Sequence, residues 1–181
     1  MNQSEKAARF AALHVKGAPL LLYNAWDAGS TQAILEAGAK AIATSSWAVA
    51  EAQGYRDGEA IPVGLVEQIV ARIAGTIEVP VTVDFEGGYS DDDTVLAENV
   101  SRLLALGVVG MNFEDRVVKG VGLYAVDRQA HRIAAMRDAA DKQGVNLFIN
   151  ARTDVFLGQQ GDPAQSAAIL ILACQGFEVA N

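Results

Sequence analysis

The sequence has very little cysteine and few basic residues. A single cysteine, Cys174, stands among 181 residues, which excludes an internal disulfide framework and a zinc site built from several cysteines. Only 14 lysines and arginines accompany 22 aspartates and glutamates, and the formal net charge of -8 disfavours nucleic acid and anionic membranes as partners. No apolar run approaches the roughly 18 residues of a membrane span, and the N-terminus does not read as a signal peptide. We therefore expect a cytoplasmic protein that binds neither nucleic acid nor a membrane.

What the sequence does contain is enough apolar material for one domain with a sizeable core. Hydrophobic residues make up 51% of the chain, too large a share for a disordered protein. Short apolar runs alternate with longer segments of helical spacing. We expect helices at about residues 4–14, 30–37, 63–73, 95–104 and 127–144, with Ser4 and Asp127 as N-caps of the first and last. We expect strands at residues 20–25, 41–45, 79–85, 108–114 and 145–151.

Strands that alternate with helices predict a parallel α/β sheet, for which two architectures remain open. A complete (β/α)8 barrel usually takes about 200 residues or more, so the length of this chain favours a doubly wound open sheet. The polar residues at the strand ends favour the barrel, because barrel enzymes keep their active sites at that end.

Polar side chains follow one face of the later strands to their C-terminal ends. Alternation places Asp84 and Glu86 on one face of the third strand, and Asn112 and Glu114 on the matching face of the fourth. Arg152 follows the fifth strand and could hold a carboxylate through two parallel hydrogen bonds. Asp84, Glu86 and Glu114 form an all-oxygen set suited to Mg²⁺, with Mn²⁺ as the alternative.

Five segments of this sequence resemble motifs of the isocitrate lyase/phosphoenolpyruvate mutase superfamily. They occur in the family's order and spacing from about residue 19 to about residue 163, and they read NAWDAGS, TSSWAVAEAQGYRDGE, VDFEGGY, NFEDR and NARTDVF. The resemblance implies a (β/α)8 TIM-barrel fold and an enzyme that makes or breaks a C–C or C–P bond beside a 2-oxo acid. It also implies Mg²⁺ and an enolpyruvate-like intermediate.

The resemblance assigns metal-binding roles to four acids. Asp84 and Glu86 stand where the family has two metal carboxylates in a D-x-D pattern, with glutamate here as the second. Glu114 matches a glutamate that reaches the metal through water, and Asp57 matches an aspartate of the same network.

Substrate-binding roles follow in the same way. Ser46 and Trp47 fall on the turn that holds the substrate carboxylate in the family, and Arg152 matches the arginine that stabilises the enolate. We add Asn112 to the candidate substrate-binding residues. The expected partner is a small 2-oxo acid or enolpyruvate-type substrate.

The loop after the fourth strand departs from the family's patterns. The lyases carry a cysteine there as general acid, and the phosphoenolpyruvate mutases carry lysine and asparagine. Residues 116–124 contain no cysteine and no asparagine. Lys119 and Tyr124 are therefore the candidate proton donors, with ordinary loop or packing roles as the alternative. The glycines at 120 and 122 are typical of a mobile lid.

The C-terminal end departs further. After Asp162 and Pro163 the chain reads AQSAAILILACQGFEVAN, whereas family members continue through three more strands. We expect a single barrel-type domain over residues 1–181, truncated after about residue 163, with five to six β/α units. Open strand edges in such a domain favour association, and we expect a homo-oligomer.

Three readings of the function remain open. The leading one is a Mg²⁺-dependent lyase or mutase-like enzyme that works through an enolate, with C–C cleavage preferred and C–P phosphonomutase chemistry as the alternative. The second is a catalytically inactive fragment that serves only in assembly or interaction. The third is another Mg²⁺ barrel, such as an aldolase.

Overall fold

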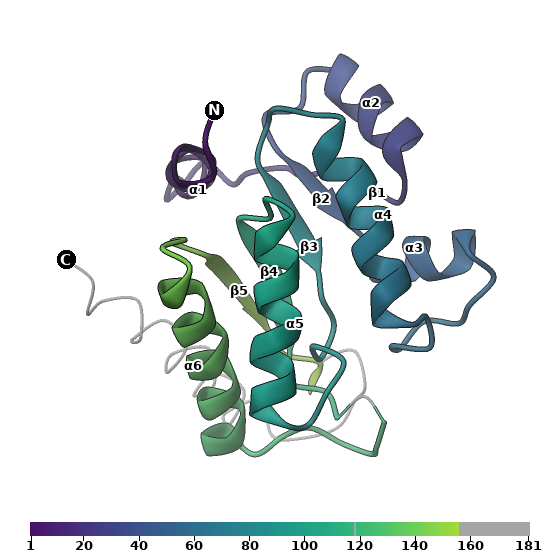
Figure 1. The fold of residues 1–181 in the computed structure, drawn as a ribbon, viewed down its shortest axis with the longest axis vertical. Coiled ribbons are helices and arrows are strands. Elements are labelled where there is room, and N and C mark those ends of the chain that lie inside the picture. The colour runs from purple at the N-terminus through teal and green to yellow at the C-terminus, as the bar shows by residue number, and fades with distance from the viewer. Residues whose placement is uncertain (118, 156–181) are drawn as a thin grey trace.

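The computed structural model describes residues 1–117 and 119–155, which form a five-stranded parallel sheet covered by helices (Figure 1). The strands lie side by side in the order in which they follow one another along the chain. A doubly wound sheet reverses its strand order at a switch point, whereas a barrel adds each strand beside the last. The structure therefore decides for the barrel-type progression over the open sheet. The strands are β1 (Asn24–Ala25), β2 (Ile42–Thr44), β3 (Val81–Asp84), β4 (Gly110–Glu114) and β5 (Phe148–Arg152).

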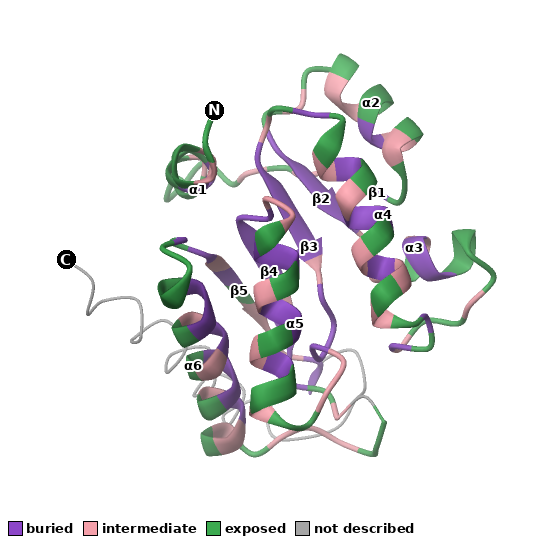
Figure 2. Cartoon of the chain, viewed as in Figure 1, coloured by how far each residue is buried: buried purple, intermediate pink, exposed green. Residues whose placement is uncertain are grey.

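Three long helices pack side by side against one face of this sheet (Figure 1). They are α4 (Val63–Gly75), α5 (Asp93–Ala105) and α6 (Val126–Lys142), and Figure 2 shows that each has a buried stripe and an exposed face. In α4 the buried positions are Val66, Ile69, Val70 and Ile73, the spacing of one helix face. The shorter helices α2 (Ala28–Glu36) and α3 (Ser46–Ala52) follow β1 and β2. The helix layer thus leaves the opposite face of the sheet to the polar residues.

Helix α1 (Gln3–Ala12) lies near the N-terminal ends of the strands. Phe10 is 1% exposed and packs in a small core with Ala7, Ala41 and Val109. Phe10 also occupies the space where a side chain at Gly110 would stand, because a Cβ there would come within 2.7 Å of the Phe10 ring. With α1 packed at this end, the C-terminal ends of the strands remain for chemistry.

Several predicted element boundaries prove wrong. The first strand was expected from residue 20, but β1 begins at Asn24, the first residue that pairs with β2. Helix α1 is capped by Asn2, not Ser4, since Asn2 and Glu5 form a reciprocal capping box. Asp127 lies in the first turn of α6 and does not cap it. The resemblance implies a turn at Ser46 and Trp47, whereas these residues begin helix α3, which Ser45 caps.

No helix in residues 1–117 and 119–155 is both long and apolar enough to cross a membrane. The truncation expected after about residue 163 and the single cysteine, Cys174, lie outside the described residues.

Candidate active site

The strand register brings the predicted site residues into neighbouring rows. Asp84 pairs with Asn112 in the ladder between β3 and β4, and Glu114 pairs with Arg152 in the ladder between β4 and β5. Paired residues of parallel strands point to the same side of a sheet. The expectation that Asp84, Asn112, Glu114 and Arg152 share one face is therefore confirmed.

Asp84 is held firmly through one of its two carboxylate oxygens. The backbone N–H of Ser46 donates to Asp84 Oδ2 over 3.0 Å, and the Ser46 hydroxyl donates to the same oxygen over 2.7 Å. The backbone N–H of Asp84 in turn donates to the Thr44 hydroxyl over 3.0 Å. Asp84 Oδ1, by contrast, is buried and has no hydrogen-bond partner among the described residues.

Arg152 contacts three carboxylates at the end of β5. Its Nη2 pairs with Glu114 Oε2, its Nε lies 3.0 Å from Asp154 Oδ1, and its Nη1 lies 3.9 Å from Asp84 Oδ1. The Arg152 side chain is 38% exposed, whereas those of Glu114 and Asp154 are 6% and 8% exposed. The acids therefore anchor the guanidinium from behind while one edge stays open to a ligand.

Sequence reasoning missed a second layer of acids behind Arg152. Asp115 is fully buried and accepts hydrogen bonds from the Thr153 hydroxyl over 2.7 Å and from the Asp154 backbone N–H over 2.9 Å. Asp115 thus fixes the turn that presents Asp154 to Arg152. Both acids lie within the motifs NFEDR and NARTDVF, so the signal was present in the sequence but went unused.

Glu86 lies beyond the end of β3 in a left-handed backbone conformation with φ of 49°. Strand alternation therefore stops at Asp84, and the Glu86 carboxylate accepts hydrogen bonds from the Glu59 backbone N–H and the Tyr89 hydroxyl. Burial raises the pKa of Glu86 to about 7, and the negative charges of Asp57, Glu59 and Asp84 add to the shift. Burial also raises the pKa of Glu59.

The four acids expected to bind metal are not assembled into one ligand cluster. Within the described residues, no group of three or more histidine, cysteine, aspartate or glutamate side chains is close enough to hold a metal ion. Asp84 and Glu114 each form an ion pair with Arg152. The Glu86 carboxylate instead accepts a hydrogen bond from the Glu59 backbone, and Asp57 is exposed. Asp84 Oδ1, which lacks a hydrogen-bond donor among the described residues, and the negative charges around Glu86 nevertheless fit a cation at this place.

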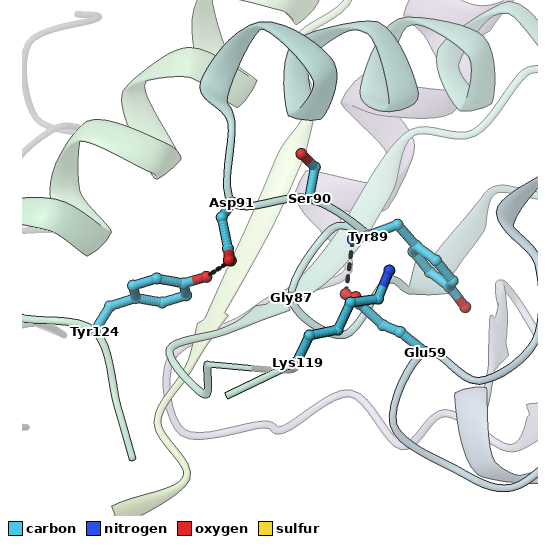
Figure 3. Close-up of a pocket in the computed structure, with 7 residues that line it drawn as sticks. All are labelled: Glu59, Gly87, Tyr89, Ser90, Asp91, Lys119 and Tyr124. Atoms are coloured by element: carbon cyan, nitrogen blue, oxygen red, sulfur yellow. Dashed lines mark hydrogen bonds between the residues drawn. The ribbon is translucent and has the colours of Figure 1, made fainter. Parts of the chain in front are cut away.

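The remaining predicted residues occupy different places around the C-terminal ends of the strands, which we call the mouth. Trp47 is 60% exposed in the first turn of α3, and Asn112 accepts a hydrogen bond from Asn150 over 2.9 Å. Lys119 and Tyr124 line a cavity of about 200 Å³ together with Glu59 and Tyr89 (Figure 3). The Tyr124 hydroxyl donates to Asp91 and not to any residue at Asp84 or Arg152. The structure thus does not bring Tyr124 together with the metal candidates.

A fully buried arginine that sequence reasoning missed supports the wall of this cavity. Arg132 of α6 donates to the backbone oxygens of Gly87 and Ser90, the latter over 3.1 Å. Its guanidinium lies 4.2 Å from the centre of the Tyr124 ring and 5.1 Å from that of Phe113. Arg132 therefore ties the loop after β3 to the segment after β4.

The sequence pattern of phosphoenolpyruvate phosphomutases matches residues 10–169 of this chain. The chain belongs to the phosphoenolpyruvate phosphomutase family. Members of this family and its structural neighbours are lyases and phosphonomutases with barrel-type folds. Family membership confirms the resemblance drawn from the five motifs.

Three relatives cover most of this chain. An uncharacterised Mycobacterium tuberculosis protein is 35% identical over 155 residues, which are 84% of this chain and 56% of the relative. The crystal structure of a candidate phosphonomutase from Burkholderia cenocepacia is 42% identical, with a TM-score of 0.87, over 94% of this chain and 69% of that one. A candidate lyase or mutase from the same organism is 30% identical, with a TM-score of 0.88, over 96% and 62%. The chain thus spans a little over half of the length of its curated relatives.

A more distant structure shares the fold alone. Phosphonopyruvate hydrolase in complex with oxalate and Mg²⁺ is 19% identical, with a TM-score of 0.82 over 97% of this chain and 60% of that one.

Proposed function

We propose that this chain carries the reaction centre of a Mg²⁺-dependent enzyme that acts on a small 2-oxo or enolpyruvate-type carboxylate through an enolate. The observation that carries the proposal is the buried Asp84 Oδ1, which lacks a hydrogen-bond partner in the described residues and lies 3.9 Å from Arg152 Nη1. A buried carboxylate oxygen without a donor is costly, and a cation beside it removes that cost. The position is at the strand ends, where barrel enzymes bind substrate.

Asp84, Glu86 and Glu114 are the residues that would hold the ion, with Asp57 adding negative charge nearby. They supply the carboxylate oxygens that Mg²⁺ or Mn²⁺ prefers. When bound, the ion would supply stabilisation of the negative charge that an enolate places on oxygen. Oxalate, a planar dianion similar to enolpyruvate, is bound together with Mg²⁺ in the phosphonopyruvate hydrolase structure, so the pair is a suitable probe.

Arg152 is the residue that we expect to act on the substrate directly. Two of its nitrogens are committed to Glu114 and Asp154, which fixes the plane of the guanidinium. The Nη1 edge is then available to donate to a substrate carboxylate and to the oxygen that gains charge as the enolate forms. A preorganised donor stabilises the transition state more than the ground state, which lowers the barrier.

The remaining residues have supporting roles in this proposal. Ser46 orients Asp84, while Trp47 and Asn112 flank the substrate. Because the Tyr124 hydroxyl is engaged with Asp91, Lys119 is the better candidate for delivering a proton from the segment after β4.

We favour C–C cleavage of a 2-hydroxy or 2-oxo diacid. Phosphonomutase chemistry is the second candidate, since the Burkholderia cenocepacia relative with 42% identity bears that description. Incubation with phosphonopyruvate, followed by phosphorus NMR, detects transfer of the phosphoryl group from carbon to oxygen. A reductase that consumes 2-oxo acids detects C–C cleavage of 2-hydroxy diacids.

The experiment that tests the site itself is thermal unfolding of the chain alone, with Mg²⁺, and with Mg²⁺ plus oxalate. A ligand that binds only the native state raises the midpoint by mass action. We expect a clear rise only when both are present. An unfolding midpoint that does not change when Mg²⁺ and oxalate are added together would contradict the proposal. Homo-oligomerisation and a cytoplasmic location belong to the same proposal, and light scattering coupled to gel filtration tests the former.

A further inference from the structure

Three residues beside the mouth share a backbone conformation that L-amino acids rarely adopt. Glu59, Glu86 and Tyr89 have φ values of 56°, 49° and 65°, and within the described part of the chain they are the non-glycine residues with positive φ. Such residues cost conformational energy and persist only where surrounding contacts over-determine them. The contacts that hold these three should therefore be visible in the structure.

The three residues hydrogen-bond to one another in a closed ring. The Glu59 backbone N–H donates to Glu86 Oε2 over 2.9 Å, and the Tyr89 backbone N–H donates to Glu59 Oε1 over 2.7 Å. The Tyr89 hydroxyl closes the ring by donating to Glu86 Oε1 over 3.4 Å. Figure 3 shows the bond between Glu59 and Tyr89 at the edge of the cavity. Glu59 and Glu86 are only 7% and 4% exposed, so water competes little for these bonds.

We propose that Glu59 and Tyr89 are positioning residues that hold the Glu86 carboxylate in one orientation. We call the three residues the left-handed clamp. This role of the clamp rests on the proposed function, in which Glu86 is one of the acids that would bind Mg²⁺. A carboxylate held by its surroundings need not lose rotamer freedom when a cation binds, which strengthens binding.

The clamp also explains why the second acid of the motif is glutamate in this chain. The left-handed turn carries Glu86 off the end of β3, and its carboxylate must still reach the Glu59 backbone N–H. An aspartate is shorter by one carbon–carbon bond, about 1.5 Å, and could not span a 2.9 Å hydrogen bond from the same backbone position. Glu86 and Glu59 thus depend on each other.

Amide hydrogen exchange tests the clamp in metal-free protein. Glu86→Ala removes the acceptor of the Glu59 amide, and we expect that amide to exchange at least about tenfold faster than in the wild type. Glu59→Ala removes the acceptor of the Tyr89 amide, whereas Glu59→Gln keeps an oxygen at that place. We expect fast exchange at Tyr89 in the alanine variant and near wild-type exchange in the glutamine variant. Equal exchange in the two variants would overturn the proposal.

Mg²⁺ titration in the presence of oxalate tests what the clamp does. Glu59→Ala and Glu59→Gln remove the same charge and differ in whether the Tyr89 N–H keeps an acceptor. We expect the alanine variant to need at least about fivefold more Mg²⁺ for half of the thermal shift than the glutamine variant needs. Tyr89→Phe should weaken the response more than Tyr23→Phe, a matched change at an exposed tyrosine. If Glu59→Ala merely lowers the metal-free midpoint, with the Mg²⁺ requirement equal to that of Glu59→Gln, the role is structural and the proposal is wrong.

The two readouts separate failure of the clamp from failure of the proposed function. If the wild-type amides of Glu59 and Tyr89 are protected from exchange but Mg²⁺ and oxalate cause no thermal shift, the metal site is refuted and the clamp is supported. If these amides exchange freely but Mg²⁺ and oxalate raise the unfolding midpoint, the clamp is refuted and the metal site is supported.

Discussion

Arg152 and Asp84 meet across the mouth in an incomplete ion pair. Arg152 Nη1 lies 3.9 Å from Asp84 Oδ1, too far for a hydrogen bond, and that oxygen is buried without a hydrogen-bond partner in the described residues. The other oxygen of Asp84 receives two hydrogen bonds from Ser46. The oxygen without a hydrogen bond, Asp84 Oδ1, therefore marks where a ligand between Asp84 and Arg152 would lie.

Asp84→Asn should abolish the response to Mg²⁺ and oxalate while preserving the fold. The amide oxygen of asparagine can still accept both hydrogen bonds from Ser46, so we expect the metal-free midpoint to stay within a few degrees of the wild type. Loss of the negative charge removes the main attraction for a cation, and the midpoint should no longer rise with the ligand pair. Thermal unfolding measures both quantities. Asp138→Asn, on the exposed side of α6, is the matched control and should respond like the wild type.

Substitution at Asp154 should weaken binding of oxalate more than binding of Mg²⁺. Asp154 accepts a hydrogen bond from Arg152 Nε over 3.0 Å, and within the described residues it forms no hydrogen bond or ion pair with any of the four acids expected to bind metal. Loss of a hydrogen bond to a charged group costs about 1.5–3 kcal/mol, and Asp154→Ala should therefore raise the oxalate dissociation constant about tenfold or more at saturating Mg²⁺.

Isothermal titration with oxalate measures that change, and Asp154→Asn provides its control. Asparagine keeps an oxygen for Arg152 Nε and should lose less affinity than alanine. A parallel loss of Mg²⁺ and oxalate affinity would instead mean that Asp154 supports the whole site and does not specifically orient Arg152.

Much of the site was predictable because it follows strand periodicity. Asp84, Asn112 and Glu114 occupy alternate positions on strands whose apolar neighbours point into the helix layer, so the sequence places them on one face. The register of the ladders then confirms their proximity. The same logic led to Arg152 at the end of β5.

The residues that sequence reasoning missed depend on backbone turns or on buried charge, which periodicity does not describe. Alternation would leave Glu86 beside Asp84, yet its positive φ turns the carboxylate toward Glu59. Arg132 occupies a core position of α6, where an apolar residue is expected, and its burial depends on backbone oxygens and a ring supplied by two other segments. Asp115 is buried in the same way through bonds to the turn after β5.

The metal-free protein should lose stability as the pH rises through the range in which Glu86 ionises. The pKa of Glu86 is about 7 in the folded state, above the ordinary value of 4.5 for a glutamate, so the folded state binds the proton more tightly than the unfolded state does. This contribution is fully present below about pH 4.5 and is lost as the pH rises through about 7. A shift of this size corresponds to a change on the order of 3 kcal/mol.

Urea unfolding at a series of pH values, with a chelator present, measures this dependence. Glu86→Gln cannot ionise, and the difference in free energy of unfolding between the variant and the wild type should grow with pH between about 4.5 and 7 in favour of the variant. Glu59, whose pKa is also raised by burial, contributes a loss of stability of the same sign in both proteins. A difference that stays constant over this range would contradict the assignment.

Gly110→Ala should destabilise the end of the sheet against which α1 packs. A Cβ at Gly110 would lie 2.7 Å from the Phe10 ring and 2.7 Å from the Thr82 hydroxyl, and the buried site offers little room to move. Overpacking of this kind costs about 1–3 kcal/mol. Gly64→Ala in α4 is the control, because nothing lies within 4 Å of its Cβ and alanine is the better helix former, worth about 0.5–1 kcal/mol. Urea unfolding should therefore show opposite signs for the two changes.

Phe10→Leu should reduce the cost of Gly110→Ala, since the two residues share one space and their effects cannot add. An undiminished cost in that background would place the clash at Thr82 and would show that α1 does not fill the end of the sheet through Phe10.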